Sequence, residues 1–316
     1  MRVAGCWPLK LGVKFPQDEA GIDPIAIRDY AQAAEDLGFD YLTATDHVIG
    51  ADPSGRIAPW IGPYTHESAI HEPFVLFGFM AGVTHRITFA TNVLILPQRQ
   101  TVLVAKQAAA LDVLSGGRLW LGVGVGWNTV EYEALGAEFG SRGARLEEQI
   151  SLLRALWTQR IVSFNGRWHR ITRAGIHPMP IQRPIPIWMG GASDRAIDRA
   201  GRLADGWFPG GSVIDPFQRA PSRANPGRPL GGPGIENWAP QIERLLASAR
   251  AAGRKPSAIA VGAQFNVLKT TPTDDFRSAL EQKAAIGSTH MTIATERAGL
   301  SWPQGHIDAL RRMRET

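Results

Sequence analysis

The sequence predicts an α/β protein folded as one (β/α)8 barrel with insertions, covering residues 1–316 as a single unit. Apolar periodicity switches repeatedly between the strand and helix patterns and gives about eight strand–helix pairs, and no shift in composition divides the chain. Parallel strands need crossover helices, and both faces of their sheet must be covered. A doubly wound sheet is the alternative architecture. In a barrel, the residues that end the strands carry the chemistry.

Composition and charge narrow the class of protein. The residues are 44% hydrophobic and 20% charged, which is typical of a globular protein. The net charge of +5 is scattered along the chain, so we expect no nucleic-acid partner. No apolar run reaches the roughly 20 residues that cross a membrane and no signal peptide is recognised, so we expect a cytoplasmic protein with no membrane partner. Cys6, the single cysteine, excludes an internal disulfide and a thiolate metal cluster.

In the first half of the chain, residues typical of helix starts and helix ends show where the predicted helices and strands lie. Asp23 followed by Pro24 is typical of a helix cap and first turn, and Ser115, Gly116 and Gly117 end a later helix. The expected strands are 10–15, 39–44, 87–96 and 119–125, and the expected helices are 23–37, 73–83 and 102–114. A Gly- and Pro-rich stretch at 50–68 is too long for a simple connection, and we expect an insertion near 50–70.

The second half continues the alternation, with two further insertions. Asn165-Gly166 between alternating apolar residues predicts a hairpin within an insertion near 160–182. The segment 210–237 is rich in Pro, Gly, Arg and Ser and lacks periodicity, so we expect a long excursion there. The expected strands are 185–189, 206–208, 258–265 and 290–294, and the expected helices are 142–157, 194–203, 240–252, 273–286 and one after Pro303.

The end of the second strand places an acid beside an imidazole. Histidine is the side chain most often used to exchange a proton, so His47 is the best candidate to pass one, and Asp46 could orient a ring or the edge of a cofactor. The alternative is an ordinary cap, with Asp46 accepting N–H bonds and His47 merely packed.

The next two strand ends could form the wall of a cofactor site. Thr91 and Asn92 could present polar groups, although taken on their own they fit strand-end capping and turn formation better. Gly122, Gly124 and Gly126 lie on one face of the fourth strand, and a face without side chains lets a flat ligand approach the backbone. Their G-x-G-x-G spacing, in mid-chain, does not fit a dinucleotide fingerprint.

The fifth strand leads into a candidate anion site, whereas metal and esterase sites are poorly supported. Gly190, Gly191, Ala192 and Ser193 precede a helix, and backbone N–H groups at a helix start can hold a phosphate; a tight turn with Ser193 as an N-cap is the alternative. No H-x-x-x-H pair or G-x-S-x-G motif is present. His66 and His71, beside two glutamates, fit a solvated loop better than a metal site.

Taken together, these strand ends resemble the bacterial luciferase-like superfamily of flavin and deazaflavin oxidoreductases, whose fold is a TIM barrel with insertions. The resemblance covers nearly the whole chain and is closest to the coenzyme F420-dependent branch. Three stretches carry it most specifically: LPQRQTVLVAKQAAALDVLSGGRLWLGVGVGWNTVEYEALG at 96–136, RGARLEEQISLLRALW at 142–157 and IPIWMGGASDRAIDRAGRLADGWFPGG at 185–211.

The resemblance implies that F420 lies at the barrel mouth and exchanges a hydride between its C5 atom and a small organic substrate. His47 would then donate or accept the proton, beside Asp46. It also predicts a non-prolyl cis peptide bond between Asn92 and Val93. The cofactor-binding residues that it implies are Asp46, Thr91, Asn92, Val93, Gly124, Val125, Gly126, Asn128, Gly190, Gly191, Ala192 and Ser193, and it implies a homodimer.

One departure from the family pattern bears on the substrate. Sugar-phosphate dehydrogenases of this group carry Glu directly after the fourth-strand glycine, where this chain has Trp127. The exchange favours a more apolar substrate, packed on Trp127 or near Trp60 and Trp207.

Two other functions stay open. The first is an FMN-dependent monooxygenase with the same phosphate loop, and the second is a non-catalytic deazaflavin-binding protein. The longer anionic tail of F420 would favour extra cations, which Arg219, Arg223 and Arg228 could supply unless they belong to a solvated loop.

Overall fold

The computed structural model describes residues 9–54, 64–209 and 238–315, and within them the chain forms a closed (β/α)8 barrel. Eight strands follow one another around the ring in the order β3, β2, β1, β11, β10, β9, β8 and β5, and β5 pairs with β3 to close it. Every pair in the ring is parallel. The bounds are β1 Lys10–Lys14, β2 Tyr41–Ala44, β3 Thr88–Thr91, β5 Leu119–Gly124, β8 Ile187–Gly190, β9 Gly206–Phe208, β10 Ala260–Asn266 and β11 His290–Ala294. The predicted fold class is confirmed.

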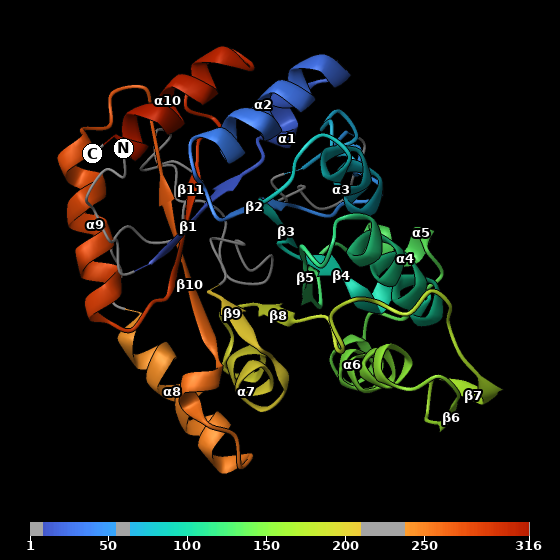
Figure 1. Cartoon of the computed structure of the whole chain (residues 1–316). Coiled ribbons are helices and arrows are strands. Elements are labelled where there is room, and N and C mark those ends of the chain that lie inside the picture. The colour runs from blue at the N-terminus through green and yellow to red at the C-terminus, as the bar shows by residue number, and fades with distance from the viewer. Residues whose placement is uncertain (1–8, 55–63, 210–237, 316) are drawn as a thin grey trace.

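Helices cover the outside of the ring, as Figure 1 shows along the chain from blue to red. Their apolar faces pack against the strands and form one large buried core with the outward-facing strand residues. Asp23 caps the first long helix through its bond from the Ile25 N–H at 2.9 Å, as its sequence predicts. The main helices are α2 Pro24–Asp36, α3 Pro73–Ala81, α4 Thr101–Leu114, α6 Arg142–Thr158, α7 Asp194–Leu203, α8 Ala239–Ala251, α9 Thr273–Ala285 and α10 Gln304–Arg314.

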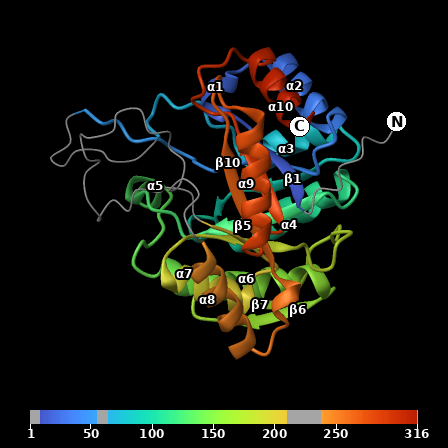
Figure 2. The same ribbon diagram turned by 90° about the vertical axis from the view of Figure 1, so that its left-hand side faces the viewer.

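Two short helices, α1 Gln17–Ala20 and α5 Thr129–Ala134, lie in connections where the sequence predicted no element. Each follows the carboxyl end of a barrel strand, β1 and β5 respectively. In Figure 2, α5 lies on the left-hand side of the ribbon, apart from the main helices. They are too short to produce a periodic apolar signal.

The expected strand at 87–96 is broken in two. β3 ends at Thr91, and a second short strand, β4 Leu94–Ile95, pairs with β5 further along it. A cis peptide bond joins Asn92 to Val93 between them, which confirms the bond that the family resemblance implied. The sequence does not predict this interruption. Every residue from Val93 to Leu96 is apolar, so the pattern indicates one continuous strand.

The structure describes only part of the insertions predicted near 50–70, 160–182 and 210–237. A hairpin of β6 Val162–Asn165 and β7 Arg170–Ala174 stands beside α6, as predicted (Figure 1). Its connection spans residues 166–169 and is closed by the Gly166 N–H on the His169 carbonyl, so it is longer than the two-residue turn that Asn-Gly suggests. The excursion at 210–237 lies outside the described residues.

The inside of the barrel is filled by aromatic side chains from neighbouring strands. Trp120 and Trp188 stack at 5.4 Å between ring centroids, and His290 meets Trp188 edge-on at 4.8 Å. Tyr41 packs against Trp120, and its hydroxyl shares a 2.8 Å hydrogen bond with Thr292. The inside of the barrel is therefore a packed core and not a pore.

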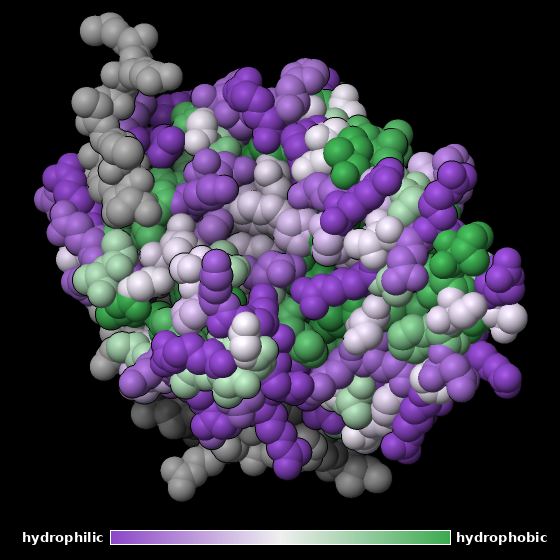
Figure 3. Space-filling model, turned by 60° about the horizontal axis from the view of Figure 1, so that its bottom comes forward, coloured by the Kyte–Doolittle hydropathy of each residue, from purple (hydrophilic) through white to green (hydrophobic). Residues whose placement is uncertain are grey.

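No helix in the described ranges has both the length and the apolar content to cross a bilayer. On the face shown in Figure 3, hydrophilic side chains predominate and hydrophobic ones are interspersed among them.

Candidate functional site

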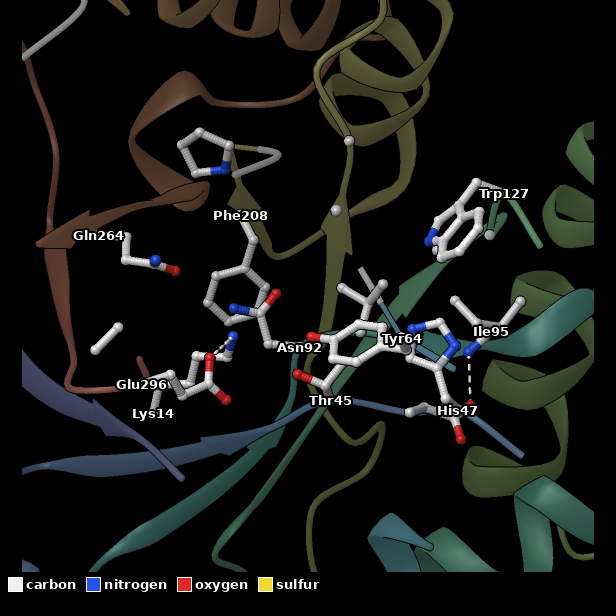
Figure 4. Close-up of a pocket in the computed structure, with 18 of the residues that line it drawn as sticks. Lys14, Thr45, His47, Tyr64, Asn92, Ile95, Trp127, Phe208, Gln264 and Glu296 are labelled. Atoms are coloured by element: carbon white, nitrogen blue, oxygen red, sulfur yellow. Dashed lines mark hydrogen bonds and ion pairs between the residues drawn. The ribbon is translucent and has the colours of Figure 1, made fainter. Parts of the chain in front are cut away.

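A cavity of about 340 Å³ lies at the carboxyl ends of the barrel strands, where the sequence predicted the site. Figure 4 shows side chains from several strand ends converging on it. Of the predicted site residues, Asp46, His47, Asn92, Val93, Gly124, Val125, Gly126, Gly190 and Gly191 line this cavity. Thr91, Asn128, Ala192 and Ser193 do not.

His47 is held by a buried carboxylate. It follows β2, and its Nδ1 lies 3.0 Å from Oε1 of Glu131 in the first turn of α5. Glu131 is 1% exposed and also accepts the Val48 N–H at 3.0 Å. With Nδ1 donating to that carboxylate, Nε2 is the nitrogen that can exchange a proton, and no group in the described ranges is found bonded to it. The arrangement orients His47 as an acid or base at the cavity wall.

Asn128, a predicted cofactor ligand, contributes to this arrangement indirectly. Its side chain is buried and accepts the Val130 N–H at 3.1 Å as the N-cap of α5. The cap sets where α5 begins and so places Glu131 in the first turn. The geometry gives Asn128 a positioning role next to the cavity.

Asp46 reaches the cavity but is fully engaged by protein groups. Its carboxylate accepts the backbone N–H of Ile95 at 2.9 Å and forms an ion pair with Arg99 at 2.7 Å. The side chain is 1% exposed. It therefore ties the end of β2 to β4 and to the start of α4, and both of its oxygens already accept hydrogen bonds from the protein.

The glycines of β5 make room for protein rather than for a flat ligand. A Cβ on Gly124 would lie 2.5 Å from Cγ2 of Val93, and one on Gly190 would lie 2.7 Å from Cγ1 of the same residue. At Gly122, the Thr91 carbonyl oxygen would be only 1.8 Å away. The expected bare glycine face is thus covered, because the segment between β3 and β4 presses into it. Val93 presents its side chain to the cavity instead.

Thr91 lies beneath this contact. It is fully buried, and its hydroxyl donates to the Gly122 carbonyl at 2.6 Å. It supports the interrupted strand and does not face the ligand space.

The loop between β8 and α7 carries the features expected of an anion site. Gly190 and Gly191 line the cavity, and Ala192 and Ser193 are exposed beside them at the start of α7. Ser193 caps the helix by accepting the Ala196 N–H at 3.3 Å. No acceptor is found within the described ranges for the backbone N–H groups of Ala192 and Ser193, so both can bind an anion.

Aromatic side chains line the cavity around His47 and at the end of β9. Tyr64 packs on the imidazole at 4.4 Å between centroids, and Trp127 meets it edge-on at 5.9 Å. Phe208, at the end of β9, lines the cavity from another side. Burial raises the pKa of Tyr64, which keeps its phenol protonated at neutral pH.

The sequence predicted that the substrate also packs near Trp207 and Trp60, and the structure does not support this for Trp207. Trp207 is fully buried and donates from Nε1 to the Gly191 carbonyl at 2.9 Å, so it supports the loop from behind and offers no surface to a substrate. Trp60 lies outside the described residues. Of the two predicted tryptophans with a described position, Trp127 keeps the predicted place beside the cavity.

A second charged group lines the cavity at β1 and β11. Lys14 ends β1 and forms an ion pair with Glu296, just after β11, and their side chains are 16% and 19% exposed. Burial lowers the pKa of Lys14, but the charge and hydrogen bond of Glu296, together with the influence of Tyr64 and Asp18, outweigh it and raise the pKa above its usual value. Arg297 pairs with Asp18 at 3.3 Å on the same wall. Gln264 donates to Asn266 at 2.8 Å from β10.

Sequence reasoning missed Lys14, Glu296 and Glu131. The rule that inspects strand ends could have found Lys14 and Glu296, which stand at the ends of the first and last strands. No spacing rule points to Glu131, because it belongs to a short helix after β5 and meets His47 only in the folded barrel.

No group of three or more His, Cys, Asp or Glu suited to a metal ion occurs among the residues with a described position. His71, which the sequence placed beside glutamates, instead lies 3.0 Å from the Gly21 carbonyl through Nε2. Arg219, Arg223 and Arg228 fall outside the described ranges.

Comparisons with known proteins agree with this geometry. Residues 9–228 match the family described as luciferase-like monooxygenase. An uncharacterized protein of Mycobacterium tuberculosis (strain ATCC 25618 / H37Rv) is 37% identical over 215 residues, which cover 67% of this chain and 74% of that protein. A protein of Nakamurella multipartita named F420-dependent glucose-6-phosphate dehydrogenase is 34% identical over 206 residues, which cover 64% of this chain and 56% of that protein.

Two solved structures show the same fold at low sequence identity. An F420-dependent secondary alcohol dehydrogenase in complex with an F420-acetone adduct has a TM-score of 0.73 at 16% identity, and the match covers 97% of both chains. The monooxygenase RslO1 from Streptomyces bottropensis has a TM-score of 0.66 at 18% identity over 97% of this chain and 98% of that one.

Proposed function

The chain belongs to the luciferase-like monooxygenase family, and on that premise we propose that it is an F420-dependent oxidoreductase acting on a small, largely apolar organic substrate. The observation that carries the proposal is the His47–Glu131 pair, which faces a cavity walled by Val93, Gly124 and Gly190. The relatives named as F420-dependent support the choice of cofactor.

The residues present fit such a cofactor. The Val93 side chain, which covers Gly124 and Gly190, offers a low, apolar wall to a planar ring, and the N–H groups of Ala192 and Ser193 can bind a phosphate at the start of α7. Asn92 and Val125 line the same space. When bound, F420 would exchange a hydride with a substrate carbon.

His47 would handle the accompanying proton. A carbonyl carbon that receives a hydride leaves negative charge on its oxygen, and the imidazole can supply a proton from Nε2 to that oxygen. In the opposite direction, Nε2 removes the proton of a hydroxyl group. Glu131 holds Nδ1 and stabilises the protonated ring while Nε2 carries the proton. Asp46 acts as a positioning residue that fixes the strand end carrying His47.

The aromatic wall supports an apolar substrate. Trp127 and Phe208 line the cavity. The family resemblance implies that Trp127 takes the place of a glutamate of the sugar-phosphate dehydrogenases. A stacking surface favours rings and hydrocarbon chains over sugars bearing phosphate.

Equilibrium binding of F420 and of FMN to the purified protein tests the proposal. We expect F420 to bind, as followed by its fluorescence, and FMN to bind more weakly or not at all. Preferential FMN binding would support a monooxygenase instead, and binding of neither would contradict both assignments. Light scattering of the same sample tests the expected homodimer.

A further inference from the structure

We propose that the Lys14–Glu296 ion pair selects the substrate by binding an uncharged polar group, such as a carbonyl, hydroxyl or amide, and by disfavouring ionic substrates. This inference rests on the proposed function, because it gives a role to the side of the cavity that a bound F420 would leave uncovered. The pair joins β1 to the segment after β11 and faces the cavity.

The barrel topology places this pair opposite the expected cofactor wall. Around the ring, β1 and β8 are four strands apart, and so are β11 and β5. Gly124 and Gly190 end β5 and β8, whereas Lys14 ends β1 and Glu296 follows β11. In Figure 4, Lys14 and Glu296 lie to one side of Asn92, away from His47 and Trp127. A planar ring against Val93 therefore leaves the β1 and β11 wall to the substrate.

The chemistry of the pair suits a neutral polar group. The Lys14 ammonium has three N–H donors and Glu296 has two acceptor oxygens, so the pair can donate to and accept from a ligand while its own charges stay matched. Gln264 and Asn266 add amide groups nearby. An amide, a carbonyl or a hydroxyl can be satisfied here without bringing an uncompensated charge into a nearly buried site.

The charge balance of the cavity argues against an anionic substrate. Among the described lining residues, Lys14 and Arg297 are cationic, and Asp18, Asp46 and Glu296 are carboxylates. Arg297 is paired with Asp18, so neither cation is available as a dedicated anion site. An anion bound beside Lys14 would also lie close to Glu296 and would be repelled.

Three probes of almost equal shape test the inference: benzamide is neutral, benzoate is an anion and benzamidine is a cation. Their dissociation constants are measured by calorimetry on the protein with F420 bound, for the wild type, Glu296→Gln and Lys14→Met. We expect the wild type to prefer benzamide. In Glu296→Gln the ammonium of Lys14 loses its partner, and the affinity for benzoate relative to benzamide should rise by about tenfold. In Lys14→Met the carboxylate of Glu296 loses its partner, and the affinity for benzamidine relative to benzamide should rise by a similar factor.

Asp308→Asn is the matched control, because it changes the net charge as Glu296→Gln does but lies in an exposed pair with Arg311 on α10. Its probe preferences should equal those of the wild type. Unchanged preferences in both cavity variants, a wild-type preference for benzoate, or no benzamide binding would overturn the inference. Thermal unfolding of each variant checks that it folds. Absence of F420 binding to the wild type would instead contradict the proposed function, and the three probes would then be compared without cofactor.

Discussion

His47 depends on a partner that is 84 residues away in the chain. An imidazole alone can rotate and can carry its proton on either nitrogen, whereas the bond from Nδ1 to Glu131 selects one orientation and leaves Nε2 for proton exchange. Glu131 is in turn oriented by the Val48 N–H, and Gln98 lies 3.4 Å from its other oxygen. Glu131 therefore gives His47 the fixed orientation that an acid or base needs.

Replacing His47 by Ala should lower turnover by about 100- to 10,000-fold while the affinity for F420 changes little, because only proton transfer is removed. Glu131→Gln should show a smaller loss in kcat, since an amide oxygen still accepts from Nδ1 but no longer stabilises the protonated ring. Oxidation of reduced F420 by neutral ketones and enones gives kcat, and cofactor fluorescence gives affinity.

The control for this pair is His85→Ala, whose side chain is exposed before β3 and away from the cavity. It should retain wild-type turnover. If His47→Ala kept full turnover with normal cofactor affinity, its role as the acid or base would be wrong, although the fold assignment would stand.

At the scale of elements, the break between β3 and β4 and the glycines of β5 and β8 form one packing unit. Val93 occupies the volume that side chains at Gly124 and Gly190 would take. The pairing of β4 with β5 fixes Val93 from one side, and Asp46 fixes the Ile95 N–H from the other. The shape of the cavity wall is therefore set by contacts between elements.

Gly124→Ala should destabilise the protein by about 1–3 kcal/mol and weaken F420 binding, because the added methyl overlaps Val93. The double variant Gly124→Ala/Val93→Ala should recover part of that stability, which a double-mutant cycle in urea measures. Gly78→Ala is the control, since nothing lies within 4 Å of its added Cβ, and it should not destabilise. Additive effects of the two cavity substitutions would contradict this direct contact.

The hairpin is attached to α6 through Glu148. This carboxylate lies 2.7 Å from Nδ1 of His169 and accepts the backbone N–H groups of Arg167 at 2.7 Å and Trp168 at 2.9 Å. Burial would raise the pKa of Glu148, but the hydrogen bonds from His169 and the backbone outweigh it and hold the pKa below its ordinary value of 4.5. The carboxylate form therefore stabilises the docked hairpin.

We expect the β6–β7 hairpin to loosen in acid before the barrel unfolds. A lowered folded-state pKa contributes stability above the ordinary value, and this contribution is lost as the pH falls below about 4.5 through the folded-state pKa. Hydrogen exchange of residues 162–174 should accelerate in that range. In Glu148→Gln the exchange should already be fast at neutral pH, whereas Glu133→Gln, on the exposed side of α5, should behave as the wild type.

At the scale of the whole molecule, closure of the barrel places a histidine in its aromatic interior. His290 is 7% exposed and is packed against Tyr41, Trp120 and Trp188. Its Nδ1 shares a 2.8 Å hydrogen bond with the Thr289 hydroxyl. Burial, together with the charge of Lys10, lowers the pKa of His290 to about 4. The imidazole is therefore neutral in the folded barrel.

The global stability should fall in mild acid because of this residue. Between its ordinary pKa of 6.5 and about 4, the unfolded chain binds a proton that the folded barrel excludes, so the free energy of unfolding decreases as the pH falls. From pH 7.5 to pH 5 the loss amounts to about 2 kcal/mol. Urea unfolding at the two pH values should show a correspondingly smaller loss in His290→Leu. An equal pH dependence in both proteins would contradict the assignment.

The sequence by itself determined the order of the eight barrel strands and their main helices, the barrel class and the place of the candidate site. These depend on periodicity and end signals that are local, and on the rule that parallel strands bring their carboxyl ends to one rim. His47, Asp46, Asn92 and the loop at 190–193 could be predicted because each directly follows a strand or precedes a helix. The cis bond at Asn92 was predicted from family resemblance and not from the residues' own pattern.

Only the tertiary structure decided which groups meet. It paired His47 with Glu131 and joined Lys14 to Glu296 where the first and last strands pair, and it filled the glycine face with Val93. It also turned Thr91 and Trp207 into supports behind the cavity. Such partners are far apart in sequence, and their approach depends on strand register and barrel closure. A local pattern contains neither, so it locates a site without revealing how its charges are matched.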